Sequence, residues 1–337
     1  MVCFVILHYM ALEETVVCVE SILHNVEGEK RIIVVDNDSP NGSVKELRDK
    51  YGDDPLVDVL ETGENLGFAR GNNYGYRYAV EHYAPSFIVV MNNDMEIRQN
   101  DFIERMEQSY EEHRFAIMGP DIYSTKKKYH HNPQTRKILT RKDLERSVMV
   151  LKAKNAMRFV FPVKWFLAEK FRGVRKLRGA EKPGEAGKLR GTGKPGEAGR
   201  LRGTGKPAQT AQLREAKAAH EELAQDRSDE RYVDHVVEEP LLHGSCYIFS
   251  EDFIKRHPDG CFYDKTFMYM EAEILYYQAR RDGEKMIYDP GLKVDHHEDV
   301  ATDATFKKQS QKSIFTVKCM LQSTKAFLDL MDRDGNV

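Results

Sequence analysis

The stretch Cys3-Phe4-Val5-Ile6-Leu7 is short and fully apolar, and the segments that follow it decide the fold class. An amphipathic stretch with helical spacing, Glu13 to Leu23, comes next, and a second mostly apolar run, Arg31-Ile32-Ile33-Val34-Val35, follows it. Short apolar strands joined by helices are typical of a parallel sheet that is buried on both faces. We therefore predict an α/β protein with a doubly wound, mostly parallel sheet.

The same alternation continues along much of the chain. Further strands are predicted at residues 56–60, 87–91, 242–249 and 285–288. Further helices are predicted up to residue 51, at 68–83, from a cap at Asn100-Asp101, from Ser250, at 271–281 and from Asp303 towards Asp329. The apolar start, residues 1–9, lacks a basic leader, so we expect a buried strand there.

The middle of the chain differs in kind. Leu177-Arg178-Gly179 recurs twice at a spacing of twelve residues, within a segment rich in glycine, proline and lysine. Such a composition offers too few apolar side chains to offset ordering entropy, so we predict a disordered basic insertion. It is either an electrostatic tether to an anionic lipid or polymer, or a tolerated repeat expansion. For residues 159–171, which mix aromatics with lysines, we favour packing on the core over contact with a membrane surface.

Composition excludes several classes of protein. The 337 residues include 51 Lys and Arg against 54 Asp and Glu, which argues against a nucleic-acid binder. The five cysteines are odd in number and form no CxxC pair, which argues against a disulfide framework and a structural zinc site and favours the cytoplasm. No apolar run reaches the roughly 18 residues of a membrane span, so any membrane contact would be peripheral.

Polar residues follow the predicted strands, where ligands of open parallel sheets bind. Asp36 could accept hydrogen bonds from a base or ribose, or it could belong to the turn that continues to Gly42. Arg70, between Gly67 and Gly71, could face a diphosphate at a helix N-terminus. Asp94, at the tip of a buried strand, could hold a divalent cation that bridges two phosphates, or it could cap the next segment. His297 could complete such a cation site.

Taken in order, these segments resemble the family 2 glycosyltransferases of the A-type fold, particularly the rhamnosyltransferase-like branch that builds bacterial surface polysaccharides. The resemblance covers about residues 2–123 and 240–303. Val34 to Gly42 is similar to the family's V-D-N-x-S-x-D/N-G turn, Asn65 to Asn73 to its N-x-G-F-A-x-G-N-N stretch, and Asn92-Asn93-Asp94 to its metal motif. Residues 242–246 resemble its acceptor-side strand, and residues 267–273 its F-x-Y-x-E-D/E motif.

The resemblance implies a role for each matching residue. Asp36 would bind the donor base, Asp94 and His297 would bind Mg²⁺ or Mn²⁺, and the acidic motif would supply the catalytic base. The remaining implied residues are Asp38, Asn65, Arg70, Asn73, Asn92 and Asn93 on the donor side and His243 and Gly244 on the acceptor side.

The acidic motif departs from the family pattern at Ala272, where a second acid is usual. Glu271 or Glu273 must then act as the base, or activity is impaired. On a regular helix the two glutamates point roughly 200° apart, so both cannot face the sugar. We prefer Glu271, whose alternative role is a first-turn glutamate favoured by the helix dipole.

The implied reaction is a single displacement at the anomeric carbon, which inverts its configuration. The donor would be a dTDP- or UDP-linked hexose such as rhamnose, and the acceptor a glycan or lipid-linked glycan, with the protein in the cytoplasm or at the inner face of the cell membrane. A catalytically impaired nucleotide-sugar-binding scaffold is the rival, motivated by Ala272. A nicotinamide-dependent oxidoreductase is disfavoured, because His8-Tyr9-Met10-Ala11 replaces the expected G-x-G-x-x-G turn.

The predicted organisation has five parts. They are a nucleotide-sugar-binding half at 1–125, a helical connecting segment at 126–171, the repeat insertion and linker at 172–231, an acceptor and catalytic half at 232–303, and a C-terminal helix and tail at 304–337.

Overall fold

The computed structural model describes residues 1–160, 232–297 and 309–335. Its contacts separate two units, one formed by Met1–Asn155 with Asp229–Val337 and the other by Ala156–Ser228. Of the second unit only the end of one helix is described. The predicted repeat insertion at 172–231 and residues 161–171 lie outside the described residues, as do Glu298 and Asp299.

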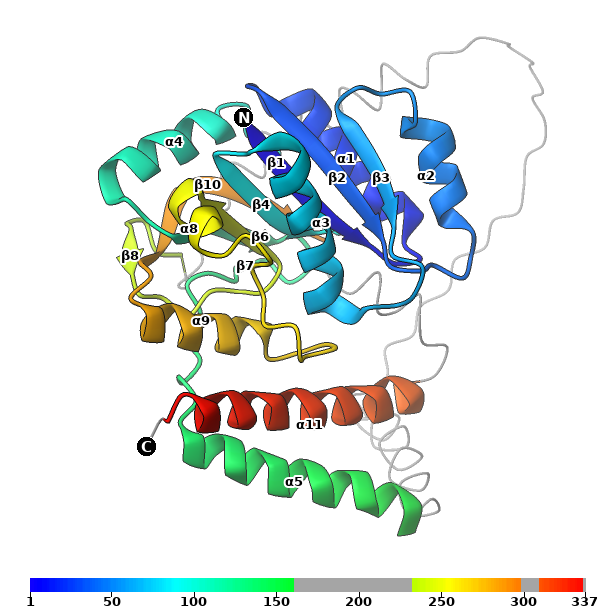
Figure 1. Cartoon of the computed structure of the whole chain (residues 1–337), viewed down its shortest axis with the longest axis vertical. Helices are drawn as coiled ribbons and strands as arrows, with labels where there is room; N and C mark the ends of the chain where they lie inside the picture. The colour runs from blue at the N-terminus through cyan, green and yellow to red at the C-terminus, as the bar shows by residue number, and fades with distance from the viewer. Residues whose placement is uncertain (161–231, 298–308, 336–337) are drawn as a thin grey trace, which may run out of the picture. The chain divides into compact units, whose positions relative to one another are not determined.

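The first unit is built on one sheet with the order β3-β2-β1-β4-β9-β6-β10-β5, in which β7 also pairs with β6 and β8 with β10 (Figure 1). Strands β3, β2, β1 and β4 are parallel, β9 runs antiparallel to both neighbours, and β6 and β10 are parallel to each other. The mostly parallel sheet is confirmed. The strands are β1 (Val2–His8), β2 (Lys30–Asp36), β3 (Val57–Glu61), β4 (Phe87–Asn92), β5 (Met95–Glu96), β6 (Ile117–Ser124), β7 (Tyr129–His130), β8 (Val237–Glu238), β9 (Cys246–Ser250) and β10 (Met286–His296).

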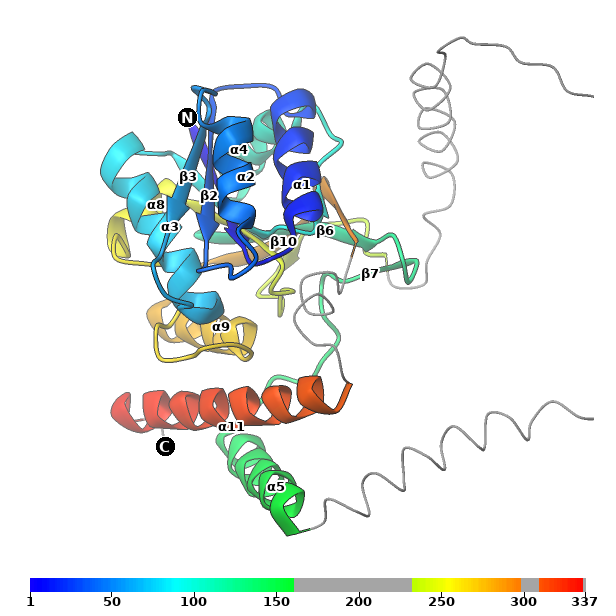
Figure 2. The same ribbon diagram turned by 90° about the vertical axis from the view of Figure 1, so that its right-hand side faces the viewer.

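Helices cover both faces of this sheet (Figure 2). Alternate strand side chains point to opposite faces, so Phe4 and Ile6 pack against α1 and α4, whereas Cys3 and Val5 pack in a second core with α3 and α9. The doubly wound arrangement is thereby confirmed. The helices described are α1 (Leu12–Asn25), α2 (Ser43–Tyr51), α3 (Gly67–Tyr83), α4 (Phe102–His113), α5 (Arg141–Val160), α8 (Glu251–Arg256), α9 (Glu271–Asp282) and α11 (Gln309–Arg333).

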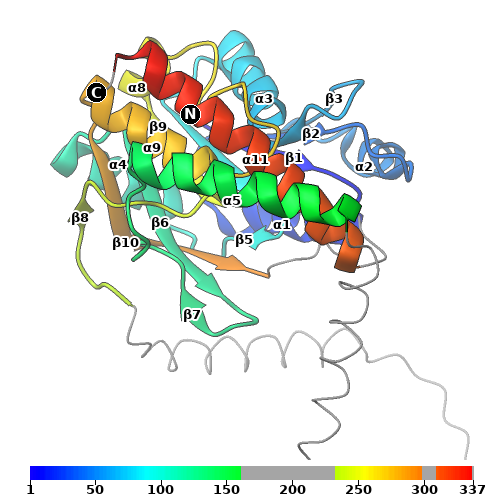
Figure 3. The same ribbon diagram turned by 90° about the horizontal axis from the view of Figure 1, so that it is seen from below.

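A third apolar cluster joins α5, α9 and α11 (Figure 3). Leu144, Ile274 and Phe327 are buried in it, and Arg141 forms an ion pair with Asp332. Helix α11 therefore packs against α9, the helix that begins with the acidic motif. No helix among the described residues is long and apolar enough to span a bilayer. All five cysteines are buried and free.

Several element boundaries differ from the prediction. β9 begins at Cys246 instead of residue 242, and the strand predicted at 285–288 is part of a longer strand, β10, that continues to His296. Ser250 caps α8 by accepting from the Phe253 N–H. Asp101 occupies the predicted N-cap position of α4, but its side chain makes no capping hydrogen bond and its carboxylate accepts from Arg105 at 2.6 Å. No strand is predicted at Ile117–Ser124, where β6 lies.

Candidate active site

The carboxyl ends of β2, β4 and β10 bring the predicted site residues to one edge of the sheet. Asp36 ends β2, Asp94 lies in the turn between β4 and β5, and His296 ends β10. The register links these ends, since His8 pairs with Asp36, Leu7 pairs with Asn92, and His296 pairs with Met95. This edge is where an α/β sheet binds its ligands.

Asp36 is the most enclosed acid on this edge, with 2% of its surface exposed. Its Oδ2 accepts from the Ser39 N–H at 3.1 Å, whereas its Oδ1 has no hydrogen-bond partner among the described residues. The His8 ring lies 3.8 Å from Oδ1, but burial lowers the pKa of His8 to about 4, so the ring is neutral near pH 7. An unbonded buried carboxylate oxygen is costly, and a base or ribose donor would satisfy it.

The loop before α3 is held by two asparagine side chains. Asn37 Oδ1 accepts from the Leu66 N–H at 2.9 Å, and its Nδ2 donates to Asn65 Oδ1 at 3.2 Å. Asn65 Oδ1 also accepts from the Gly67 N–H at 3.0 Å. Asn65 therefore shapes this loop. Asn37, which is not among the predicted site residues, positions it, whereas the predicted Asp38 is exposed.

Gly67 shows why this loop needs glycine. Its φ is +77°, and a Cβ at this position would stand 2.2 Å from the Phe267 carbonyl oxygen. That same oxygen accepts from the Phe68 N–H at 2.7 Å. The start of α3 is thereby attached directly to the segment that leads into the acidic motif.

Asn73 and Arg70, both predicted on the donor side, have different surroundings. Asn73 is buried, accepts from the N–H groups of Cys261 and Phe262 at 3.0 and 2.9 Å, and donates to the Phe262 carbonyl at 2.7 Å. Arg70 is half-exposed, and its guanidinium lies 3.5 Å from Glu64. Asn73 thus joins α3 to the chain before α9, while the Arg70 guanidinium reaches solvent at the edge.

Asn73→Ala should lower the free energy of unfolding by roughly 2–4 kcal/mol, because three buried backbone hydrogen bonds are lost. Chemical denaturation measures this loss, and Arg70→Ala is the matched control from the same helix, with an expected change within about 0.5 kcal/mol. An Asn73→Ala variant with unchanged stability but weaker binding of the nucleotide-sugar donor would instead support a direct contact between Asn73 and the donor.

The neighbouring residues Asn93 and Asp94, after the end of β4, have different surroundings. Asn93 is buried and donates to Thr15 Oγ1 at 2.9 Å, which ties the turn to α1, and the Asn92 N–H donates to the Ser245 carbonyl at 2.8 Å. Asp94 is 7% exposed, and within the described ranges its Oδ1 has no hydrogen bond. That oxygen lies 3.3 Å from His296 Nε2.

His296, and not the predicted His297, brings its ring to Asp94. The His297 N–H donates to the Asp94 carbonyl at 2.9 Å, but its imidazole contacts Glu96 at 3.1 Å. The hydrogen bond to Glu96 raises the pKa of His297. Neighbouring residues of an extended chain point in opposite directions, so only one of the two rings can face Asp94.

Glu271 and Glu273 occupy different environments at the start of α9. Glu271 is 8% exposed and accepts from Thr266 Oγ1 at 3.0 Å, and its burial raises its pKa to about 7. Glu273 is paired with Arg136, whose Nη1 lies 3.0 Å from Glu273 Oε1. A carboxylate with a pKa near 7 suits a general base, whereas the Glu273 carboxylate is already held in an ion pair with Arg136.

His243 belongs to a group of three imidazoles. The backbone N–H of His243 donates to Asn132 Oδ1 at 2.7 Å, and its ring Nδ1 lies 2.8 Å from Ser245 Oγ. The ring centroid of His243 is 4.3 Å from that of His131 and 5.8 Å from that of His296. Burial, with the neighbouring His131 and His296, keeps the pKa of His243 well below its usual value. The predicted acceptor-side residue therefore lies beside the Asp94 edge, and Gly244 follows it in the turn before β9.

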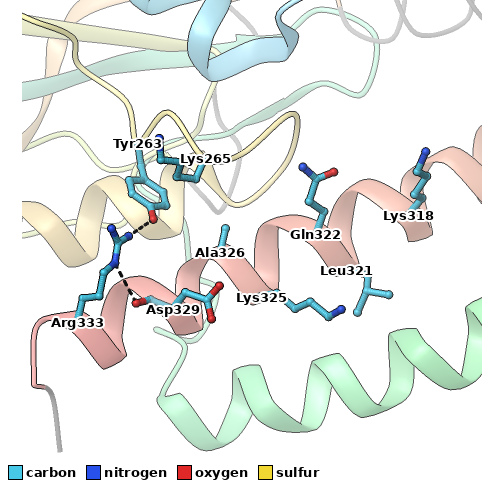
Figure 4. A pocket seen from close by; sticks show the side chains of 9 residues that line it. All are labelled: Tyr263, Lys265, Lys318, Leu321, Gln322, Lys325, Ala326, Asp329 and Arg333. Atoms are coloured by element: carbon cyan, nitrogen blue, oxygen red, sulfur yellow. Dashed lines mark hydrogen bonds between the residues drawn. The ribbon is translucent and has the colours of Figure 1, made fainter.

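A separate cavity of about 660 Å³ lies between α11 and the segment before α9 (Figure 4). Lys318 and Lys325 line it, and Arg333 there contacts the Tyr263 hydroxyl. None of the predicted site residues lines this cavity.

Comparison with known proteins matches residues 3–176 to the model of glycosyl transferase family 2. The low-salt glycan biosynthesis hexosyltransferase Agl10 of Haloferax volcanii is 27% identical over 118 residues, 35% of each chain. The dTDP-rhamnosyl transferase RfbF of Shigella flexneri is 32% identical over 102 residues, 30% of this chain and 32% of the relative. The alignments thus span about a third of each relative. A solved structure of GalNAc-T7 with UDP, GalNAc and Mn²⁺ covers 88% of this chain and 43% of that chain at 11% identity and a TM-score of 0.49.

The family match covers more than half of the chain and includes β1 to β7, so it contains the edge formed by Asp36 and Asp94. The mostly parallel sheet, with the site at its carboxyl edge, is the glycosyltransferase A-type fold that the sequence motifs predict. The chain belongs to glycosyl transferase family 2.

Proposed function

We propose that this chain transfers a hexose, or a deoxyhexose such as rhamnose, from a dTDP- or UDP-linked donor to a glycan or lipid-linked acceptor, with inversion at the anomeric carbon. The names of Agl10, a hexosyltransferase, and RfbF, a dTDP-rhamnosyl transferase, support the choice of sugar. They also disfavour the impaired-scaffold alternative. A lipid-linked acceptor would bring the chain to the inner face of the cell membrane by peripheral contact.

One observation carries the proposal: three buried carboxylates come from three different parts of the chain and differ in their hydrogen bonding. Asp36 and Asp94 each keep one oxygen without a hydrogen bond within the described part of the chain. Glu271 accepts a hydrogen bond and has a pKa raised to about 7. Two carboxylates are thus available to hold a ligand and a third is suited to take a proton.

The side chains at Asp94 fit a divalent cation that is also coordinated by the nucleotide-sugar donor. No group of three or more His, Cys, Asp or Glu in the described ranges could hold a metal by itself. Mg²⁺ is commonly bound through one or two carboxylates and completes its shell with substrate phosphates and water. Asp94 offers one carboxylate, with the His296 imidazole 3.3 Å from it as a neighbouring nitrogen ligand. A bound cation would supply charge stabilisation to the departing diphosphate. His297 stays a prediction as a ligand, since its ring contacts Glu96.

Glu271 would remove the proton from the acceptor hydroxyl as that oxygen attacks the anomeric carbon. The new bond forms on the face opposite the leaving nucleoside diphosphate, which inverts the anomeric centre. Asp36 would hold the nucleoside through its unbonded Oδ1. Thr266 holds the Glu271 carboxylate in position through its hydroxyl.

Thermal unfolding against UDP, dTDP and other nucleoside diphosphates, with and without Mn²⁺, tests this proposal. A ligand at about 100 times its Kd should add about 2.7 kcal/mol. We expect the shift with UDP or dTDP to depend on Mn²⁺ and to disappear in Asp36→Ala, while Asp53→Ala, at an exposed aspartate outside the predicted site, keeps it. If no nucleoside diphosphate stabilises the wild-type protein, the proposed activity is wrong for this chain.

A further inference from the structure

A second pocket adjoins the candidate active site, with a volume of about 440 Å³. The imidazoles of His131, His243 and His296 line one part of it, and Lys127 and Arg136 line another. The ring centroids of His131 and His296 are 5.3 Å apart, so the three imidazoles form a compact group. The volume lies within the range of about 300–1,000 Å³ that is usual for small-molecule sites.

The lining of this pocket is suited to an anion. Lysine and arginine supply positive charge and imidazoles supply N–H donors, while no Asp or Glu is among the described residues that line it. An arginine guanidinium presents its donors in a planar fork that matches phosphate oxygens. A phosphate group therefore satisfies this set of side chains better than a neutral sugar would.

The position of the pocket indicates which substrate would carry the phosphate. His296 Nε2 lies 3.3 Å from Asp94 Oδ1, on the donor side, and Arg136 Nη1 lies 3.0 Å from Glu273 Oε1, at the acidic motif. One side of the pocket lining thus contacts Asp94, and another side contacts Glu273 in the first turn of α9. An acceptor whose hydroxyl is deprotonated at α9 would place its neighbouring groups in this pocket.

We propose that this pocket binds a phosphate group carried by the sugar acceptor, so that the acceptors of this chain are phosphorylated molecules. The inference rests on the proposed transferase function, because it assigns the pocket to the acceptor of that reaction. Arg136 and Lys127 hold the phosphate, and the three imidazoles surround the part of the acceptor next to it. The diphosphate of the donor is the other source of the same chemistry, and the experiment separates the two.

The experiment titrates inorganic phosphate into the full chain by calorimetry at fixed ionic strength, with Mg²⁺ and a saturating nucleoside diphosphate. We expect phosphate to bind in the presence of the nucleotide, and the double variant Lys127→Ala/Arg136→Ala to bind it at least tenfold more weakly. The matched control is Lys318→Ala/Lys325→Ala, which removes the same charge at the 660 Å³ cavity and should leave phosphate affinity unchanged.

Two results would overturn the inference. Competition between phosphate and the nucleoside diphosphate would assign the pocket to the donor, and equal phosphate affinity in the wild type and the Lys127→Ala/Arg136→Ala variant would exclude the pocket as the anion site. Failure of the proposed function looks different, because then the nucleoside diphosphate itself does not bind. Phosphate binding by the pocket can still be measured in that case.

Discussion

Replacing Asp94 with alanine should remove the Mn²⁺-dependent part of the nucleoside diphosphate stabilisation and lower kcat/KM about a thousandfold, or roughly 4 kcal/mol of transition-state stabilisation. Asp94 is the buried acid at the tip of β4 whose Oδ1 has no hydrogen bond among the described residues, so under the proposed function its loss would remove the main oxygen ligand for the cation. Thermal shift with and without Mn²⁺ and donor hydrolysis measure the two effects. An Asp94→Ala variant that keeps its Mn²⁺ response would show that the cation binds elsewhere.

The two adjacent histidines provide the sharpest control for this prediction. His296→Ala should weaken the Mn²⁺ response, because its Nε2 lies 3.3 Å from Asp94 Oδ1. His297→Ala should leave the Mn²⁺ response in place, because the ring of His297 contacts Glu96 at 3.1 Å. The reverse result would support the ligand that the sequence alone predicts.

This choice between histidines shows what the sequence could not determine. The sequence places both histidines at the end of a strand, where neighbouring side chains point in opposite directions. Which ring faces Asp94 depends on the pairing of β10 with β5, where His296 stands opposite Met95. That register joins segments two hundred residues apart, and no local pattern encodes it.

Strand prediction failed where glycine and proline lie inside strands. Gly119-Pro120 lies within β6, although such a pair usually ends a strand, and the Pro120 carbonyl instead accepts from Asn132 Nδ2 at 2.8 Å. Asp289-Pro290-Gly291 resembles a turn, but β10 passes through it with a register shift against β6. The parallel strands β1, β2 and β4 contain uninterrupted apolar runs and were predictable, because this pattern is local.

Side-chain roles were harder to predict than the edge on which the residues lie. The motifs place Asp36, Asn73 and Asp94 near the carboxyl ends of strands, and the structure confirms the position of the two acids there. Asn73 instead binds the backbone of Cys261 and Phe262, almost two hundred residues away. A polar residue in a motif can thus hold the site together through hydrogen bonds to a distant backbone segment.

Replacing Glu271 with glutamine should lower kcat by roughly 10²–10⁴-fold, because glutamine cannot accept the proton of the acceptor hydroxyl. In the wild type, kcat/KM should rise as the pH increases through about 7, where the buried Glu271 carboxyl loses its proton. The variant should lose this rise. Glu273→Gln is the matched control two residues away, and it should retain most of the activity, since Glu273 is paired with Arg136.

Stability provides a second measurement that does not depend on knowing the acceptor. The pKa of Glu271 is raised from 4.5 to about 7 in the folded chain, so the folded state binds this proton more tightly than the unfolded state. The resulting stabilisation is complete below pH 4.5 and is lost as the pH rises through about 7, a change of roughly 3 kcal/mol. Glu271→Gln should lack this decline, which denaturation at pH 5 and pH 8 would detect.

The two measurements together decide whether Glu271 is the base. Loss of both the pH-dependent stability and the activity places the buried, titrating carboxyl in the reaction. If Glu271→Gln loses only the pH dependence of the unfolding free energy and keeps its activity, Glu271 is a structural acid at the start of α9. In that case another group takes the proton, and turnover should instead fall in Glu273→Gln.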